Sequence, residues 1–291
     1  MNIFLPSSIR NLWEGSWLKF LLGEQLCFAK YYDSKFPLIN NALIITTHNN
    51  AYKDHVDLMI KNGLNFGIFL LSDEFLTDKC EYIENPLCKF LIRNYIHPSL
   101  YQNPKVLHIG LGYKRNFDKY LLNTEYLERD VTWNFIGSVH GESRSKALST
   151  FDQLEGGFIH TTKHFNSDDY LSTEEYCSVL SRSCYTLCPQ GHANNETFRI
   201  FEALESGSIP IVLKNSEHHP FNPGYWHYLF TGDTSFPFIV ADNWDEALLI
   251  VKNDLAEGRT YLRLKQCQLF WHKWKSSWKY QFHMKLSLLG F

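Results

Sequence analysis

The chain has 291 residues, a length that predicts about two domains. Its hydrophobic fraction of 44% and charged fraction of 20% are those of an ordinary globular protein. The net charge of −3 provides no basic surface, which argues against nucleic acid as a partner.

The first part of the chain reads as a parallel α/β domain. Trp13, Trp17 and Leu21 lie at helical spacing and predict a helix that packs on this domain. Apolar runs then alternate with polar helical patterns, which is the order of a parallel sheet. The predicted strands are 42–46, 66–72, 90–94 and 106–110, with a helix over about 52–62. The charged stretch 125–131 lacks a strand pattern, so we place the domain junction there, giving domains of 1–130 and 131–291.

The second domain opens with a predicted strand, 132–136, that runs into a glycine-bearing turn. A turn of this kind after a first strand cradles phosphate in Rossmann-like domains, which makes Ser138 a candidate donor-binding residue. Ser172 and Glu175 form a capping-box pattern that predicts the start of the helix 172–181. The other predicted elements are strands 158–161 and 236–240 and helices 244–253 and 261–289. We expect the last helix to pack back toward the first domain.

The stretch 185–213 predicts a βαβ unit with a right-handed crossover. An apolar strand over 185–188 gives way to a polar loop that begins at Pro189. Asn194 or Asn195 is the expected N-cap of a helix over about 196–206. Gly207 is expected to end that helix, and 209–213 reads as a second buried strand.

The helix of this unit carries a polar stripe formed by Glu196, Arg199, Glu202 and Ser206. The stripe begins at the edge of the sheet where open α/β folds bind ligands, and a helix N-terminus favours an anion there. Arg199 has the geometry to reach a diphosphate and Glu202 to accept the hydroxyls of a ribose. An ordinary solvated helix face with ion pairs explains the same pattern equally well.

The same segment resembles the signature region of the exostosin-family glycosyltransferases. The shared pattern is an apolar strand with Cys-Pro, a glycine-bearing polar loop, Ser/Thr-aromatic-Arg, Glu-Ala-Leu, a glycine and Ile-Pro-Val. It is matched here by Cys188-Pro189, Gly191, Thr197-Phe198-Arg199, Glu202-Ala203-Leu204, Gly207 and Ile209-Pro210-Ile211, and earlier by Trp133, Phe135, Gly137 and Arg144. The compact form of the chain resembles members of this family from large algal viruses and microbes, and it is also similar to the xylose-transferring branch.

The resemblance implies a GT-B-like architecture, in which two Rossmann-like domains carry parallel sheets that face a central cleft. It implies an inverting glycosyltransferase that uses a UDP-sugar, with xylose as the preferred sugar, and an oligosaccharide or glycoprotein glycan as acceptor. Arg144 and Arg199 are then expected on the diphosphate and Glu202 on the ribose, with Glu196 and Thr197 on phosphate or donor sugar. The chain contains no Asp-x-Asp sequence, so we expect neither a metal ion nor a cofactor.

An inverting transfer needs a general base, which we expect on the first domain. Asp73 and Glu74 follow a predicted buried strand, and His48 follows the first strand of that domain. These three residues are the candidate catalytic groups. A turn or capping role is the commoner fate of polar residues after strands and stays open for each of them.

Two other functions fit the same pattern. A protein with a degenerate GT-B fold would bind nucleotide sugar or carbohydrate without turnover, and an epimerase would convert the donor without an acceptor. The seven cysteines show no metal-binding spacing, and the apolar run near the N-terminus is too short for a signal peptide or a transmembrane segment. We therefore expect reduced thiols in the cytoplasm, which is the host cytoplasm if a virus encodes the chain.

Overall fold

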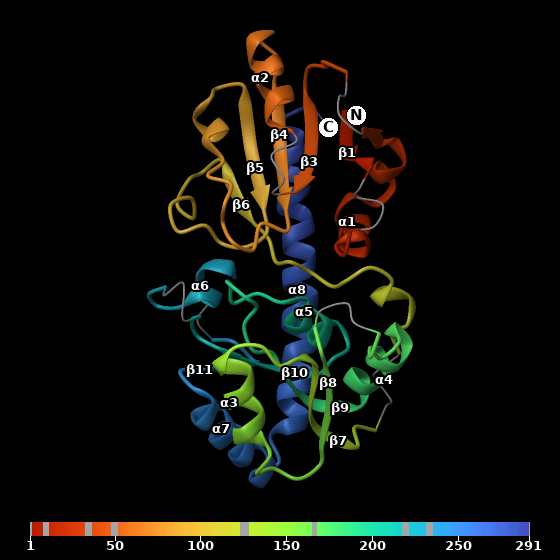
Figure 1. The fold of residues 1–291 in the computed structure, drawn as a ribbon, viewed down its shortest axis with the longest axis vertical. Coiled ribbons are helices and arrows are strands. Elements are labelled where there is room, and N and C mark those ends of the chain that lie inside the picture. Colours follow the sequence, from red (N-terminus) through yellow and green to blue (C-terminus); the bar gives the residue numbers. More distant parts are fainter. Residues whose placement is uncertain are drawn as a thin grey trace. The chain divides into compact units, whose positions relative to one another are not determined.

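The computed structural model describes residues 2–7, 12–32, 37–47, 52–122, 128–164, 168–216, 221–230 and 235–290. The chain divides into two compact units (Figure 1). Unit 1 contains residues Met1–Leu111 and Lys275–Phe291, and unit 2 contains Gly112–Trp274. Each unit is built around one sheet whose described strands all run parallel.

The described sheet of unit 1 has the strand order β2-β1-β3-β4-β5-β6. Its strands are β1 (Asn2–Pro6), β2 (Lys30–Tyr32), β3 (Ala42–Thr47), β4 (Phe66–Leu71), β5 (Cys88–Arg93) and β6 (Val106–His108). The four strands predicted for this domain are all present. The sequence did not predict β1 and β2, because β2 has only three residues, two of them exposed, and β1 carries no alternation of apolar and polar side chains.

Helices cover the sheet of unit 1 with aromatic side chains. They are α1 (Gly15–Leu22), α2 (Lys53–Lys61) and the end of α8 (Thr260–Ser287), with short 3₁₀ segments at Gly23–Phe28 and Glu81–Glu84. The ring of Trp278 on α8 lies edge-on to Trp17 of α1, with centroids 6.3 Å apart. Phe282 contacts Phe69 of β4 at 5.4 Å. The last turns of α8 are therefore part of the core of unit 1.

The described sheet of unit 2 has the order β11-β10-β9-β7-β8. Its strands are β7 (Val131–Ser138), β8 (Gly157–Thr162), β9 (Ser183–Leu187), β10 (Ile209–Leu213) and β11 (Ile239–Ala241). Its helices are α3 (Glu142–Phe151), α4 (Thr173–Arg182), α5 (Phe198–Glu205), α6 (Tyr225–Leu229) and α7 (Trp244–Ala256), with a 3₁₀ turn at Phe117–Lys119. The predicted capping box of α4 is present, with Ser172 as N-cap and Glu175 bonded back to it.

The division between the units falls after Leu111, about twenty residues before the junction predicted from the charged stretch. The reason lies in the contacts of the segment that follows. The backbone N–H of Lys114 donates to Glu202 of α5 at 3.2 Å, and Phe117 packs edge-on against Tyr176 of α4 at 6.0 Å. The charged stretch in the sequence indicated only a polar loop. The unit to which a segment belongs is decided by its packing contacts.

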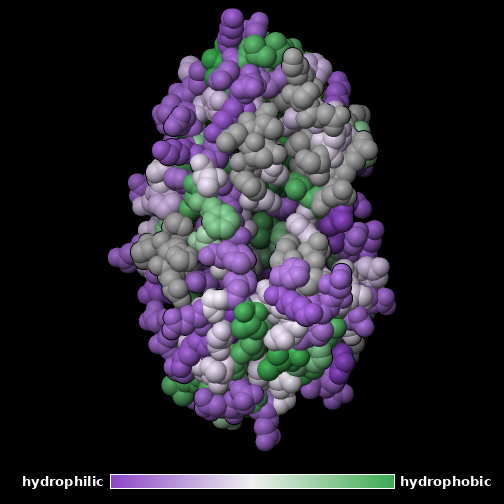
Figure 2. Space-filling view, viewed as in Figure 1, coloured by the Kyte–Doolittle hydropathy of each residue, from purple (hydrophilic) through white to green (hydrophobic). Residues whose placement is uncertain are grey.

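The face of the molecule in Figure 2 is mainly hydrophilic, and the apolar side chains visible there lie in small groups. Within the described part of the chain, every helix is too short or too polar to cross a membrane.

Candidate functional site

The βαβ unit predicted from the sequence is present in unit 2. Strand β9 pairs in parallel with β10, and α5 connects them. The N-cap of α5 is Thr197, whose backbone is extended, so the helix starts at Phe198 and the prediction of Asn194 or Asn195 as the cap was wrong. The backbone N–H of Gly191 donates to the carbonyl of Asn194 at 2.8 Å. This turn holds both asparagines in the loop before the helix.

The C-terminus of α5 ends as predicted. Gly207 has a φ of +71°, in the left-handed region that favours glycine. Its N–H donates to the carbonyl of Leu204 at 3.1 Å, and the N–H of Ser208 donates to Ala203 at 2.9 Å. These two bonds form a Schellman motif, which satisfies carbonyls at the helix end and turns the chain into β10.

Arg199, in the first turn of α5, is anchored across the end of β7. Its Nε and Nη2 both donate to the carbonyl of Ile136, at 3.1 and 2.7 Å. The guanidinium lies over the ring of Phe135, 4.9 Å from its centroid. Its third nitrogen, Nη1, is buried and has no hydrogen-bond partner among the described residues. The side chain is thus fixed at one edge while the other edge presents a charged donor.

Gly137 makes this position of Arg199 sterically accessible. Its φ is +143°, and a Cβ added to it would lie 2.4 Å from Nη2 of Arg199. A side chain at this place would displace the guanidinium or distort the end of β7. The glycine of the predicted phosphate turn therefore serves to admit an arginine from α5.

Arg144 ties two loops of unit 2 together. Its Nη1 donates to the carbonyl of Ser138 at 2.8 Å, and its Nε and Nη2 donate to the carbonyl of Gln190 at 3.2 and 3.0 Å. The side chain is buried. These bonds join the turn after β7 to the loop after β9, so Arg144 shapes the loops around Arg199, and its contact with a diphosphate stays a prediction.

Two histidines of these loops were missed by the sequence analysis. The rings of His140 and His192 stack in parallel with centroids 3.8 Å apart. Nδ1 of His140 lies 3.1 Å from the hydroxyl of Ser138, and its Nε2 is buried without a partner among the described residues. Burial lowers the pKa of His140 to about 4, and the nearby cations Arg144 and Arg199 add to the shift. The two histidines belong to different loops, so no local sequence pattern predicts that their rings stack.

The other predicted donor-side residues lie in the same loop and helix start. The Oγ1 of Thr197 is buried and lacks a partner within the described part of the chain. The Glu196 side chain is buried, and its Oε1 accepts a hydrogen bond from Tyr225 of α6. Thr197 thus offers a free hydroxyl beside Arg199, whereas Glu196 connects the loop to α6.

Glu202, predicted to bind a ribose, is 2% exposed and already has protein partners. Its Oε1 accepts the backbone N–H of Lys114 at 3.2 Å, and its Oε2 accepts the hydroxyl of Tyr176 at 2.7 Å. The ammonium of Lys114 lies 4.5 Å from the centroid of the Tyr176 ring. Burial, with the Glu202 carboxylate beside it, raises the pKa of Tyr176, so this hydroxyl stays a donor. The ribose role of Glu202 stays a prediction.

Asp73, the first of the candidate bases, follows β4 in unit 1 and has both carboxylate oxygens engaged. Oδ1 accepts the backbone N–H and the hydroxyl of Thr77, each at 3.0 Å. Oδ2 accepts the N–H of Asp78 at 3.2 Å and pairs with Nη2 of Arg93 at 3.1 Å, and both members of this pair are buried. These contacts give Asp73 a structural function, and its catalytic role stays a prediction.

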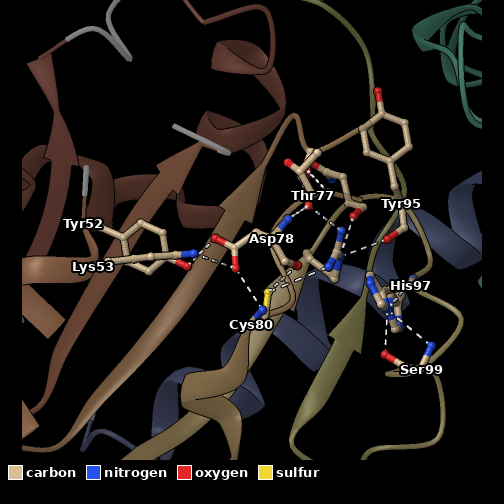
Figure 3. Close-up of polar contacts among 12 residues, drawn as sticks. Tyr52, Lys53, Thr77, Asp78, Cys80, Tyr95, His97 and Ser99 are labelled. Atoms are coloured by element: carbon tan, nitrogen blue, oxygen red, sulfur yellow. Dashed lines mark hydrogen bonds and ion pairs between the residues drawn. The ribbon is translucent and has the colours of Figure 1, made fainter. Parts of the chain in front are cut away.

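A second buried carboxylate, Asp78, extends this network (Figure 3). It accepts the hydroxyl of Tyr52 at 2.7 Å and the N–H of Cys80 at 2.8 Å, and the ammonium of Lys53 lies 3.8 Å away. The network joins the start of α2 to the loop after β4. It therefore stabilises the carboxyl edge of the sheet of unit 1.

The other two candidate bases are Glu74 and His48. Glu74 lies half-buried in the turn after Asp73, and His48 lies outside the described residues. No group of three His, Cys, Asp or Glu side chains in the described ranges is arranged to hold a metal ion.

The RXYLT1 C-terminal domain family matches residues 114–288, which is more than half of the chain. The chain belongs to this family. It is thereby one of the exostosin-like, xylosyltransferase-type proteins that the signature segment indicated. The matched region begins three residues after the end of unit 1's first segment and contains the whole site around Arg199.

Two similar vertebrate proteins are both ribitol-5-phosphate xylosyltransferases. Ribitol-5-phosphate xylosyltransferase 1 of Danio rerio is 25% identical over 181 residues, covering 60% of this chain and 41% of that protein. The protein of the same name from Homo sapiens is 27% identical over 161 residues, covering 50% of this chain and 35% of that protein. The matches therefore span about two fifths of these longer proteins.

A solved glycosyltransferase shares the fold. The structure of a DNA-modifying β-glucosyltransferase, determined with and without uridine diphosphoglucose, aligns with a TM-score of 0.53 and 12% identity over 99% of this chain and all of that one. At this identity the similarity concerns the fold alone. The expected GT-B-like architecture of two parallel sheets with flanking helices is confirmed.

Proposed function

We propose that this member of the RXYLT1 C-terminal domain family is an inverting, metal-independent glycosyltransferase that moves a sugar from a UDP-sugar to a hydroxyl of a glycan. The observation that carries the proposal is Arg199. Two of its nitrogens are fixed on the carbonyl of Ile136, and Nη1 is left without a partner among the described residues. A buried, oriented guanidinium edge is suited to a diphosphate oxygen.

Other groups around Arg199 support an anion at this place. The hydroxyl of Thr197 and the Nε2 of His140 are also buried without described partners. If the hydroxyl of Ser138 is the donor in its contact with Nδ1 of His140, the neutral ring carries its proton on Nε2 and is a donor there. The N-terminus of α5 adds free backbone N–H groups and the positive end of the helix dipole. Arg199, Thr197, His140 and the helix N-terminus are therefore the groups that we propose to contact the anion.

The proposed metal independence follows from this set of donors. A diphosphate leaving group needs positive charge or hydrogen-bond donors in the transition state. Arg199, with Arg144 behind the adjoining loops, supplies fixed charge at the carboxyl end of β7. We therefore expect transfer in the presence of a metal chelator.

The ribose is proposed to bind at Glu202. Each carboxylate oxygen can accept two hydrogen bonds, and Lys114 and Tyr176 account for one on each. The hydroxyl of Tyr176 donates to Oε2 of Glu202. A ribose hydroxyl would donate to the same carboxylate, either beside Tyr176 or in its place. Removal of the Tyr176 hydroxyl should thus affect UDP binding far less than removal of the Glu202 carboxylate.

Xylose is the proposed sugar, because the relatives named above are xylosyltransferases. The name of these relatives also includes ribitol 5-phosphate, so polyol phosphates belong in the acceptor panel beside glycan hydroxyls. A cytoplasmic location remains part of the proposal.

The test is an activity screen with purified protein. UDP-xylose and other UDP-sugars are supplied with glycan and polyol-phosphate acceptors, with and without EDTA, and products are followed by mass spectrometry. Transfer that persists in EDTA, with inversion at the anomeric carbon, is the expected result. UDP binding without turnover would support the binding-protein alternative, donor conversion without acceptor would support an epimerase, and loss of activity in EDTA would overturn metal independence.

A further inference from the structure

A pocket lies at the carboxyl edge of the sheet of unit 2, beyond the ends of β10 and β11. Leu213 and Ala241 are paired at the ends of these neighbouring strands. Lys214 and Asp242 follow them directly, and both line the pocket. The carboxyl ends of parallel strands are where α/β sheets bind their ligands. The pocket is therefore on the same sheet edge as the loops after β7 and β9.

Helix α6 connects this pocket to the loop that precedes Arg199. Its residues Trp226 and His227 line the pocket. The neighbouring Tyr225 donates a hydrogen bond to Oε1 of Glu196, which lies in that loop. The pocket and the proposed diphosphate site thus belong to one unit and are joined by a direct contact between their elements. A nucleotide sugar whose diphosphate binds at Arg199 requires a neighbouring pocket of this kind.

Part of the pocket wall is aromatic, and its largest ring is fixed. The indole N–H of Trp226 donates to the carbonyl of Leu213 at 2.8 Å. The same ring lies edge-on to Phe238, with centroids 6.3 Å apart. Phe236 and His227 complete this part of the lining. Small-molecule sites combine apolar and aromatic walls with a few placed polar groups, and the C–H groups of a sugar ring pack on such walls.

The charged groups of the pocket are two carboxylates and one ammonium, from Asp242, Glu246 and Lys214. Nζ of Lys214 lies 3.6 Å from Oδ1 of Asp242, and both side chains are exposed. The backbone N–H of Asp242 donates to Oε2 of Glu246 at 2.7 Å, which places the second carboxylate beside the first. Carboxylates accept hydrogen bonds and an ammonium donates them, so these three groups can bind sugar hydroxyls in either role.

Gly224, which also lines the pocket, allows the stem of Lys214 to lie against the backbone. Its φ is +151°, and a Cβ added to it would lie 2.8 Å from Cγ of Lys214. The N–H of Tyr225 donates to the carbonyl of Lys214 at 3.1 Å. The stem is thereby packed against the turn before α6, which restricts the positions that the ammonium can take.

Size and charge together define the class of ligand. The pocket has a volume of about 290 Å³. Small-molecule sites have volumes of about 300–1,000 Å³, so this one suits a single sugar unit. Asp242 and Glu246 outnumber Lys214, whose ammonium already has Asp242 as its partner. A uronic acid would bring a third carboxylate to the same place, where like charges repel, whereas a neutral sugar has no such cost.

We propose that this pocket holds the sugar of the donor and selects a neutral sugar over a uronic acid, an inference that rests on the proposed function. The sugar ring packs on the aromatic wall at Trp226. Its hydroxyls donate to Asp242 and Glu246 and accept from Lys214. Xylose, the proposed sugar, is neutral and meets these conditions. Glucuronic acid does not, because its carboxylate would face two others across the pocket.

The test compares UDP-glucose with UDP-glucuronic acid, whose sugars differ only in a hydroxymethyl group or a carboxylate, by titration calorimetry. The wild type should bind UDP-glucose at least about tenfold more tightly. The double variant Asp242→Asn, Glu246→Gln keeps the shapes and acceptor oxygens but removes both charges, and should reduce this preference to about threefold or less. Asp245→Asn is the matched control, because this carboxylate precedes Glu246 on α7 but pairs with Lys146 and is not part of the pocket lining.

UDP alone is the reference ligand. Its dissociation constant should change by less than about twofold in the double variant, because the pocket holds only the sugar. Asp242→Asn alone, at an exposed position, repeats the comparison with a smaller change and should lose part of the preference. Equal binding of the two UDP-sugars by the wild type, or tighter binding of UDP-glucuronic acid, would overturn the inference.

Two further outcomes locate the origin of the preference. A preference that survives in the double variant, or that falls as much in Asp245→Asn, would come from outside the pocket and would also overturn the inference. A wild type that binds neither UDP nor any UDP-sugar would instead overturn the proposed function, and the inference with it. Binding of UDP therefore tells the two failures apart.

Discussion

At the scale of the residue, the proposed diphosphate site depends on how Arg199 is held. A lysine could approach a phosphate oxygen, but it could not also place two donors on the carbonyl of Ile136. The planar guanidinium is suited to both tasks, because its three nitrogens share one rigid plane. Gly137 completes the arrangement by leaving room for Nη2.

Arg199→Ala should weaken UDP binding by about 1.5–3 kcal/mol, the range for a charge-assisted hydrogen bond, as measured by titration calorimetry. Arg199→Lys should recover only part of this loss, because the ammonium is not oriented by Ile136. Arg182→Ala is the control, since that arginine forms an exposed pair with Asp130. Unchanged binding in Arg199→Ala would place the diphosphate elsewhere.

His140 should make the stability of unit 2 depend on pH. Its pKa in the folded protein is lowered to about 4, so the folded state holds this ring neutral where the unfolded chain would protonate it. The stabilisation is fully present above about pH 6.5 and is lost as the pH falls from there toward 4. In thermal melts the wild type should lose stability over this window more steeply than His140→Gln, and parallel curves would rule out the titration.

At the scale of the element, the turn after β4 shows why a carboxylate at a strand end is an ambiguous signal. The sequence places Asp73 at the edge where catalytic residues occur, but the fold gives it Arg93 from the neighbouring strand β5. A buried ion pair thus connects the ends of two adjacent strands. A different carboxylate, Glu14, has one oxygen without a hydrogen-bond partner among the described residues.

Asp73→Asn should destabilise the protein by about 3–5 kcal/mol, because it leaves the buried Arg93 without its counterion. Urea denaturation followed by circular dichroism measures this change. Asp242→Asn is the comparison, since Asp242 and Lys214 form an exposed pair whose loss should cost less than about 1 kcal/mol. Equal effects from the two substitutions would refute the structural assignment of Asp73.

At the scale of the whole molecule, the distribution of thiols should report on the integrity of both units at once. All seven cysteines are free, and Cys27 is the exposed one. Burial raises the pKa of five others to about 12, those of Cys80, Cys88, Cys177, Cys188 and Cys267. Cys27 is therefore the thiol most accessible to a reagent in solution.

Ellman's reagent should label one thiol rapidly in the native protein and seven in guanidinium chloride. Cys27→Ser should abolish the rapid phase and leave the slow one. Several rapid thiols in the native protein would show that one unit opens readily. Fewer than seven after denaturation without reductant would reveal a disulfide and contradict the expected reducing compartment.

The predictions that succeeded were those in which local chemistry leaves few choices. The strand-helix-strand unit around α5, its end at Gly207 and the capping box at Ser172 depend on neighbours within a few residues. The strands β1 and β2 were missed because short strands are stabilised by pairing with neighbouring strands, which a local sequence pattern does not show. The junction was placed too late because the Lys114 segment is assigned to unit 2 by its contacts with distant residues.

The sequence by itself determined the alternation of parallel strands and helices and the family signature that contains Arg199. It could do so because apolar periodicity, capping and glycine conformation act over one or two turns of chain. Only the tertiary structure decided the partners of the charged groups: Asp73 pairs with Arg93, Glu202 accepts from Tyr176, and Glu14 accepts from Ser72. These pairings join residues 20 to 58 positions apart, and a buried charge acquires its chemistry from whatever the fold brings beside it.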